Sequence, residues 1–177
     1  MTAGFAVIIL AVFGLVVFRH YHPAVSADAA FYTDLYDDYQ DHGHRPPDAE
    51  DRAEDERLKN ILTRFTAFDK VVNYLQQQNY TLIERRFCTL DNTDFLHLIY
   101  MKDGKYLSVF FKKTNAPIFK DKPTKTISNV AVHECVERGQ AMTALEATRG
   151  VVLLLGELPD TELHKLADAT APLMPAA

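Results

Sequence analysis

The sequence is poor in cysteine and has no excess of positive charge, and each shortage excludes a class of protein. Its 177 residues include two cysteines, which are too few for a disulfide framework and lack the four-ligand spacing of a structural zinc site. The formal net charge is -5, so no basic surface of the kind that binds phosphate backbones is expected. We therefore expect neither a disulfide-rich nor a nucleic-acid-binding protein.

The short motifs that carry catalysis are also missing. The sequence has no G-x-S-x-G, no P-loop, no G-x-G-x-x-G and no H-E-x-x-H, and the stretch "HEC" from His133 to Cys135 lacks the second histidine of a zinc protease. A nucleophilic pair of Cys135 with His133 would need two residues of one strand face to touch, and a third group to orient them. We therefore expect no enzymatic activity.

The most prominent feature that is present is an uncharged apolar run, "TAGFAVIILAVFGLVVF", over Thr2–Phe18. As a helix it would extend about 25 Å, which is just enough to span the hydrocarbon core of a bilayer. We expect residues 1–22 to form a transmembrane anchor that ends with aromatic and histidine side chains at the headgroup level. Small residues would let neighbouring membrane helices approach this anchor closely. These residues are Gly4, Ala11 and Gly14.

A cleaved signal peptide is the alternative interpretation of this run. The sequence begins without Lys or Arg, and the nearest small-residue cleavage site, Ala24–Ala27, lies well beyond the apolar residues. Both features favour an uncleaved anchor. Its orientation is poorly defined, because Arg19 is the only flanking Lys or Arg. Under the positive-inside rule this one charge would leave the rest of the chain in the cytoplasm.

Residues 23–56 are predicted to form a helix and then a charged connector. Apolar residues recur with helical spacing, at i, i+3, i+4 and i+7. They are Tyr32, Leu35, Tyr36 and Tyr39. The three tyrosines could bind a partner protein, since aromatic residues concentrate in interface cores, or they could cover the chain's own domain. Arg45–Asp55 follows with two prolines and dense charge, which predicts a solvated connector.

An α+β domain is predicted over residues 57–170. Two helices come first, because apolar residues recur at helical spacing between Leu58 and Leu75. Short β-branched and aromatic runs then predict an antiparallel sheet of five or six strands. These runs are Tyr80–Cys88, Phe95–Met101, Tyr106–Phe111, Val130–Val136, Ala141–Glu146 and Val151–Leu155.

Turns and a final helix complete this predicted domain. Asp103 and Gly104 lie between two of the runs and supply the positive φ angles of a two-residue hairpin turn. The segment between the two strand groups contains several lysines and prolines and is predicted to be a loop. A C-terminal helix is expected to begin at a cap formed by Asp160 or Thr161. Residues 171–177 are expected to form a tail.

Four residues of the predicted sheet are candidates for binding a metal ion. Their thiolates and imidazoles suit Cu(I) or Zn. They are Cys88, His97, His133 and Cys135. Alternatively, each is an ordinary buried or hydrogen-bonded residue, or Cys88 and Cys135 form a disulfide if the domain lies in an oxidising compartment. A group of histidines near the N-terminus is another metal candidate, and it consists of His20, His22, His42 and His44.

The motifs of the predicted sheet together resemble a known domain. A cysteine-bearing strand precedes "HLIY", a D-G hairpin leads into "LSVF", and "LLGELP" precedes a helix that contains "LHKLA". In this order they resemble the extracytoplasmic C-terminal domain of membrane-spanning bacterial anti-sigma factors. The matching positions are Cys88, His97, Leu98, Tyr100, Gly104, Ser108, Phe110, Gly156, Leu158, Pro159, Leu163 and Leu166.

This resemblance implies a location and also a difference from the family. It places the domain in the periplasm, outside the bacterial inner membrane, against the hint from Arg19. Members of the family carry a cytoplasmic zinc-associated domain that captures the sigma factor, and residues 1–4 are too few to form one. We therefore expect a single-pass protein that is either an anti-sigma-like regulatory module or an accessory subunit of a membrane complex, respiratory or photosynthetic. A periplasmic copper- or thiol-handling domain is the alternative.

Overall fold

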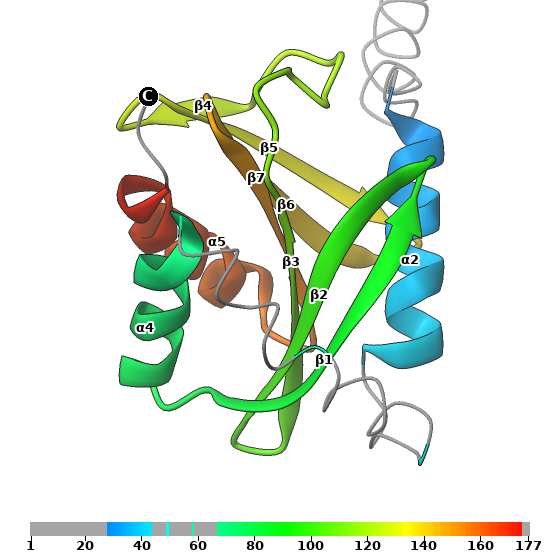
Figure 1. Cartoon of the computed structure of the whole chain (residues 1–177), viewed down its shortest axis with the longest axis vertical. Helices are drawn as coiled ribbons and strands as arrows, with labels where there is room; N and C mark the ends of the chain where they lie inside the picture. The colour runs from blue at the N-terminus through cyan, green and yellow to red at the C-terminus, as the bar shows by residue number, and fades with distance from the viewer. Residues whose placement is uncertain (1–27, 44–48, 50–57, 59–66, 175–177) are drawn as a thin grey trace, which may run out of the picture.

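Seven strands form one antiparallel sheet, with helices on both of its faces (Figure 1). The computed structural model describes residues 28–43, 49, 58 and 67–174. The strand order across the sheet is β1-β2-β3-β7-β6-β5-β4. The strands are β1 (Thr81–Leu90), β2 (Thr93–Lys102), β3 (Lys105–Lys112), β4 (Lys125–Ile127), β5 (Val130–Glu137), β6 (Gln140–Ala147) and β7 (Gly150–Gly156). The predicted α+β class and antiparallel sheet are confirmed.

Two-residue turns whose residues adopt the left-handed conformation join β1 to β2, β2 to β3, β4 to β5 and β5 to β6. Lys102 pairs with Lys105 across the β2–β3 turn, where Asp103 has φ 51° and Gly104 has φ 76°. Positive φ at both central positions is what a type I′ hairpin turn requires. The D-G hairpin that the sequence predicts is therefore confirmed.

The central strand β7 separates two apolar layers. Its residues are buried along its whole length, because a strand in the middle of a covered sheet has no solvated face. Leu154 packs with helices α4 (Asp69–Gln77) and α5 (Asp160–Thr170) on one side. Leu153 packs with helix α2 (Ala29–His42) on the other. We refer to these two sides as the α4/α5 face and the α2 face, and Figure 1 shows them on the left and right of the sheet.

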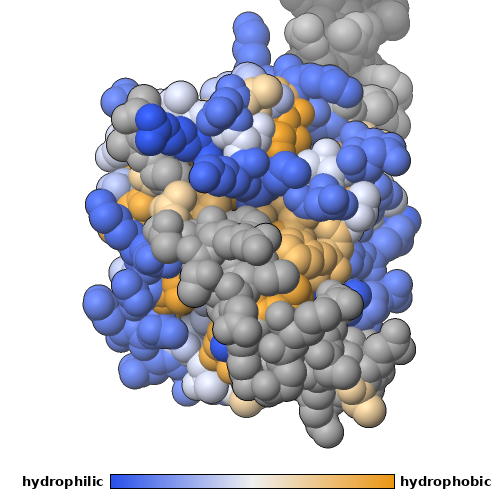
Figure 2. All heavy atoms as spheres, in the orientation of Figure 1, coloured by the Kyte–Doolittle hydropathy of each residue, from blue (hydrophilic) through white to orange (hydrophobic). Residues whose placement is uncertain are grey.

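The α4/α5 face holds the larger apolar core. In α4, Val71 and Leu75 are fully buried, as the helical spacing of apolar residues predicts. In α5, Leu163 and Ala167 pack against the same layer. Seen from one side as spheres (Figure 2), hydrophilic residues lie around the rim of the molecule and apolar residues lie nearer the centre. Burial of this layer is the main source of the domain's stability.

Three details of the fold differ from the sequence-based expectation. The sheet gains a seventh strand, β4, whose three residues pair with β5 at the edge of the sheet, and a run this short within a Lys- and Pro-containing loop carries no strand pattern. Helix α5 has Pro159 as its N-cap, so Asp160 lies in the first turn. Ala171–Leu173 forms a 3-10 helix and Met174 is buried, so the domain extends beyond residue 170.

Several predictions concern residues outside the described ranges. These residues include the apolar run over Thr2–Phe18, Arg45–Asp48 of the connector, and the predicted helix-packing and metal-binding positions Gly4, Ala11, Gly14, His20, His22 and His44. Among residues 28–43, 49, 58 and 67–174, no helix has the length and apolar character needed to cross a membrane. The predicted anchor stays a prediction.

Candidate functional site

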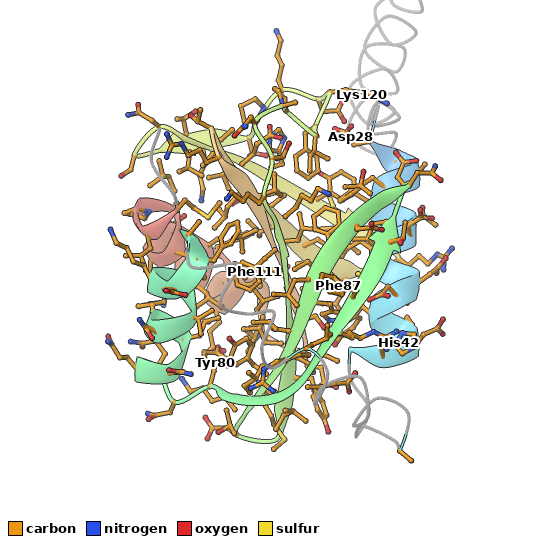
Figure 3. All side chains as sticks on the ribbon, in the orientation of Figure 1. Asp28, His42, Tyr80, Phe87, Phe111 and Lys120 are labelled. Carbon is orange, nitrogen blue, oxygen red and sulfur yellow. The ribbon has the colours of Figure 1, made fainter. Side chains whose placement is uncertain are left out.

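A polar cluster lies between α2 and the first three strands, within an otherwise apolar layer. Helix α2 buries Leu35 and Tyr39 against the sheet, and Asp38, three residues after Leu35, therefore projects toward the same side. His97 of β2 meets it from the sheet. Figure 3 labels His42 at the C-terminal end of α2, close to β1. We call this group, which consists of Asp38, His42, Cys88, His97 and Ser108, the His97 cluster.

The imidazole of His97 is fully buried and contacts a polar partner through each nitrogen. Nε2 lies 2.9 Å from the hydroxyl oxygen of Ser108, and Nδ1 lies 3.1 Å from Oδ2 of Asp38. The ring stacks on Phe110 with 3.9 Å between centroids. Burial lowers the pKa of His97 and outweighs the opposing effect of Asp38. The imidazole is therefore held in its neutral form.

Asp38 is the anionic member of the cluster. Burial alone would raise the pKa of this carboxyl, but hydrogen bonding and attraction to His97, together with Arg86, lower it below its usual value. Its side chain is 13% exposed, and its Oδ1 lies 3.9 Å from Nδ1 of His42. The carboxylate thus remains ionised at the edge of the cluster, where it can attract a cation.

The order Ser108, His97, Asp38 matches the order of groups in a hydrolase triad, in which histidine joins a hydroxyl to a carboxylate. Ser108 is completely buried. A Cβ atom on Gly43 would lie only 2.5 Å from its hydroxyl oxygen, so the helix end covers the serine closely. A nucleophile must reach a reacting atom, and this hydroxyl has no such access in the structure. Its role here is to orient His97.

Cys88 adds a thiol to the same place. One oxygen of Asp38, the sulfur of Cys88 and one ring nitrogen of His97 all lie within 4.8 Å of one another. Cys88 belongs to β1. Side chains two residues apart along a strand point to the same face of the sheet, and the pairing of β1 with β2 places Cys88 on the α2 face. A carboxylate, a thiol and an imidazole at this spacing form a possible metal-binding cluster.

The structure separates the four metal candidates that the sequence brings together. Cys88 and His97 are close, but β2, β3, β7 and β6 lie between β1 and β5, which carries the other two. His133 stacks on Phe119 with 4.6 Å between ring centroids, and its Nε2 lies 3.8 Å from Glu146. The predicted four-residue site is therefore wrong, since its halves belong to different parts of the sheet.

The predicted disulfide is not formed either. Cys88 and Cys135 are both thiols, and a disulfide would require their Cα atoms to approach within about 7 Å. Four intervening strands prevent that approach. Burial, with a smaller effect of Glu137, raises the pKa of Cys135 to about 12, so this thiol is protonated at neutral pH and is a poor nucleophile.

The three tyrosines of α2 do not form an exposed docking stripe. Tyr32 and Tyr39 are buried against the sheet, so their predicted role in partner binding is wrong and the alternative, cover for the chain's own domain, is confirmed. Tyr36 is only partly buried. The guanidinium of Arg138 lies 5.0 Å from the centre of its ring, in a cation–π contact that ties α2 to the β5–β6 turn.

A second polar site, which no sequence pattern predicts, fastens the 113–124 loop over the α2 face. The carboxylate of Asp28, just before α2, accepts hydrogen bonds from the backbone N–H groups of Lys120 and Asp121. Glu146 likewise accepts one from Ile118 at 2.6 Å. The backbone N–H groups that these two carboxylates bind are 27 to 93 residues away in the sequence, so no local motif predicts the contacts.

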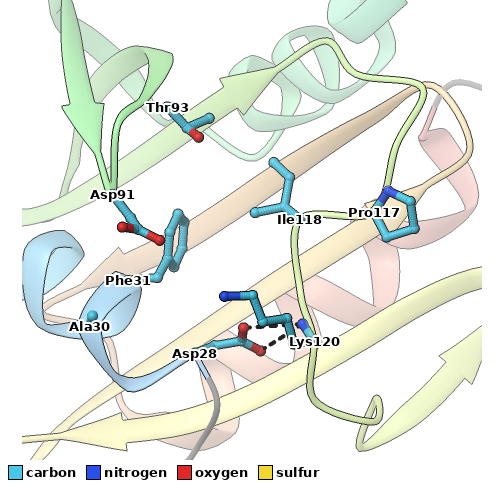
Figure 4. A pocket seen from close by; sticks show the side chains of 8 residues that line it. All are labelled: Asp28, Ala30, Phe31, Asp91, Thr93, Pro117, Ile118 and Lys120. Atoms are coloured by element: carbon cyan, nitrogen blue, oxygen red, sulfur yellow. Dashed lines mark hydrogen bonds between the residues drawn. The ribbon is translucent and has the colours of Figure 1, made fainter.

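A small pocket opens beside this second site (Figure 4). Its volume is about 280 Å³. Phe31 and Ile118 provide apolar walls, while Asp91 and Lys120 supply charged groups of opposite sign. Asp28 is also part of its lining, but its carboxylate already binds the loop backbone. The pocket therefore combines apolar walls with charged groups of both signs.

Comparison with known proteins provides no further guide to this site. No family model matches the chain, and no curated protein or solved structure matches it. The likeness to anti-sigma factors therefore rests on the motifs of the sequence alone.

Proposed function

We propose that this chain is a non-enzymatic, single-pass membrane protein whose periplasmic α+β domain works by binding partner proteins. The observation that carries the proposal is the position of α2, which follows the apolar run over Thr2–Phe18 by ten residues. A run of this length is long enough to span a bilayer. The domain would be held close to the membrane, and α2 would be its link to the anchor.

The packing of α2 supports a function in which the link matters. Phe31 and Leu35 are buried in the α2 face, and Asp28 binds the 113–124 loop. A helix attached this firmly cannot move without disturbing the sheet. Partner binding to the domain would therefore shift the anchor as well, as a regulatory module of the anti-sigma type requires. In an accessory subunit of a respiratory or photosynthetic complex, the same attachment would fix the orientation of the domain.

Protease protection tests the membrane topology directly. Spheroplasts that express the full chain with a C-terminal epitope are treated with a protease, and we expect the epitope to be lost from intact spheroplasts. A variant without residues 1–22 but with a cytoplasmic start is the control, and its epitope should survive until the cells are lysed. Protection of the full-length protein in intact spheroplasts would contradict the proposal.

Co-purification in mild detergent tests for a membrane complex. We expect a defined set of integral membrane proteins to accompany the full chain. Gly14→Leu should reduce their recovery, because a bulky side chain prevents close helix approach, whereas the matched change Val16→Leu should not. Equal recovery of the partner proteins with both variants would contradict the proposed packing surface.

Metal handling is a second candidate function, and one observation favours it. The possible metal-binding cluster places Asp38, Cys88 and His97 together, although His133 and Cys135 lie elsewhere. Metal analysis of the purified protein separates this candidate from a pure binding module. Copper or zinc that is lost in Cys88→Ser but retained in Cys135→Ser would support metal handling, and the absence of bound metal after reconstitution would exclude it.

A further inference from the structure

The His97 cluster contains polar atoms whose bonding is incomplete. Nδ1 of His97 and Oδ2 of Asp38 are both buried and lie 3.1 Å apart, but their alignment is poorer than that of a regular hydrogen bond. Nδ1 of His42 is also buried without a hydrogen bond. Buried polar atoms normally have partners, and leaving one without a partner is costly. His97 and His42 thus each place one of these nitrogens near an oxygen of Asp38, at 3.1 and 3.9 Å, where the group could bind a cation.

The contact with Ser108 would orient His97 to bind a cation through Nδ1. In a metal-bound state Nε2 would donate its proton to the serine hydroxyl, which lies 2.9 Å away, and the lone pair of Nδ1 would bind the ion beside Asp38. Histidine ligands of metal ions typically donate a hydrogen bond from the N–H of their second ring nitrogen to an oxygen in this way. Ser108 is therefore placed as the group that fixes the tautomer and ring orientation of a metal ligand.

The spacing of the three groups fits one tetrahedral ion. Bonds of about 2.0 Å to nitrogen or oxygen and 2.3 Å to sulfur place neighbouring ligand atoms of zinc about 3.3–3.6 Å apart. The nitrogen–oxygen distance between His97 and Asp38 is 3.1 Å, and Cys88 is within 4.8 Å of both. The sulfur therefore lies near enough to join an ion bound by the other two atoms.

The chemistry of the donors favours zinc over Cu(I). Copper(I) prefers sites rich in sulfur, whereas zinc accepts thiolate, imidazole and carboxylate together. Two anionic ligands, Asp38 and the Cys88 thiolate, would neutralise the charge of the ion. The nearby Arg86 guanidinium is offset by Glu84, whose carboxylate lies 3.9 Å away. The local charge therefore does not oppose a divalent cation.

We propose that Asp38, Cys88 and His97 bind a zinc ion, with His42 as the fourth ligand, and that this ion fastens α2 to β1 and β2. Asp38 and His42 are four residues apart on one face of the helix. The side chain of His42 is 26% exposed and provides the side from which the ion enters. The inference rests on the metal-handling candidate for its setting, and it is independent of the membrane assignment.

Cobalt substitution tests the ligand set. The full chain is purified in mild detergent, stripped with a chelator under reducing conditions and titrated with Co²⁺, and zinc affinity is then measured by competition with a chromophoric chelator. We expect saturation at a single equivalent, tetrahedral visible bands and a thiolate-to-cobalt charge-transfer band in the near ultraviolet. Zinc should displace the cobalt.

Variants identify the individual ligands. Cys88→Ser should abolish the charge-transfer band, and Asp38→Asn and His97→Gln should abolish tight zinc binding. Ser108→Ala should weaken zinc binding about 10–100-fold, because it acts through His97. Cys135→Ser and His133→Gln are the matched controls and should behave as the wild type. Circular dichroism in the absence of metal establishes that each variant is folded.

Each outcome separates this inference from the broader candidate. Zinc binding with the predicted spectrum, lost in Cys88→Ser, supports the site. Metal binding by the wild type without a thiolate band, or a preference for Cu(I), overturns the site while leaving metal handling intact. No uptake of either metal by the folded wild type overturns both. Hydrogen exchange then tests the clamp, since zinc should slow exchange in α2, and unchanged exchange would contradict it.

Discussion

The two faces of the sheet are both covered by helices but differ in chemistry. The α4/α5 face is built from apolar residues such as Phe68, Leu98 and Leu154. The α2 face buries ionisable side chains as well, among them His97 and His133. Apolar contacts vary little with pH or metal ions, whereas buried ionisable groups respond to both. One face therefore provides constant stability, and the other provides stability that depends on conditions.

The largest effect is expected on the α4/α5 face. Phe111 is fully buried and packs on Phe68 with 4.9 Å between ring centroids. Phe111→Ala should lower the free energy of unfolding by about 3–5 kcal/mol, measured by urea denaturation. The control is Phe87→Ala, at a partly exposed aromatic residue, which should cost much less. Equal losses would mean that this face is not the main core.

Removing the charge of Asp38 should have an intermediate effect that is confined to α2. Asp38→Asn leaves Nδ1 of buried His97 without its anionic neighbour, at an expected cost of about 1–3 kcal/mol. Hydrogen exchange should quicken in α2 but not in α5. The neighbouring change Asp37→Asn, at an exposed side chain, should cost roughly 0–1 kcal/mol. If exchange quickened equally in both helices, the two faces would not be separable.

The stability of the α2 face should fall on acidification because of His133. Burial lowers the pKa of His133, and Glu146, Asp28 and Asp121 offset this only in part. The unfolded chain therefore binds a proton near the ordinary pKa of 6.5 while the folded chain resists it. Stability from this group is present above that pH and is lost as the pH falls below it.

Urea denaturation at a series of pH values between neutral and mildly acidic conditions measures this effect. His133→Gln should flatten the dependence, although part of it should remain because His97 has a lowered pKa as well. A wild-type protein that became more stable on acidification would reverse the assigned sign.

The smallest effect is expected where α2 meets the β5–β6 turn at the surface. Arg138 donates a hydrogen bond of 2.9 Å to Asp37 and lies over Tyr36. Exposed ion pairs and cation–π contacts contribute little, so Arg138→Ala should cost roughly 0–1 kcal/mol. Thermal unfolding measures it, with Arg138→Lys as the conservative control. A loss of several kcal/mol would show that the rim, and not the layer beneath, holds α2.

The sequence predicted elements better than it predicted sites, for a physical reason. Strands and helices follow from local periodicity, as in β7 and α4, and the D-G turn follows from the φ angles that Asp103 and Gly104 adopt. Strand order depends on pairing between distant residues. Because the sequence does not reveal the strand order, it allows Cys88 and Cys135 to be predicted as neighbours, although β1 and β5 are far apart in the sheet.

Only half of the candidate site can be predicted from the sequence. Cys88 and His97 are recognisable as chemistry-bearing residues on neighbouring strands. Asp38 was not singled out, although its position three residues after Leu35 places it beside the apolar stripe of α2. Ser108 is one small polar residue in an apolar strand, and only the pairing of β2 with β3 brings it to His97.

The sheet consists of two meanders joined along one seam. Strands β1 to β3 and strands β4 to β7 each pair with neighbours in the chain, and only β3 with β7 joins distant segments, from Leu107 opposite Gly156 to Lys112 opposite Val151. Closing that seam must order the whole intervening chain, which is entropically slow. Each meander could therefore form early and separately. A chain cut in the 113–124 loop would then reassemble from its two fragments through the pairing of β3 with β7.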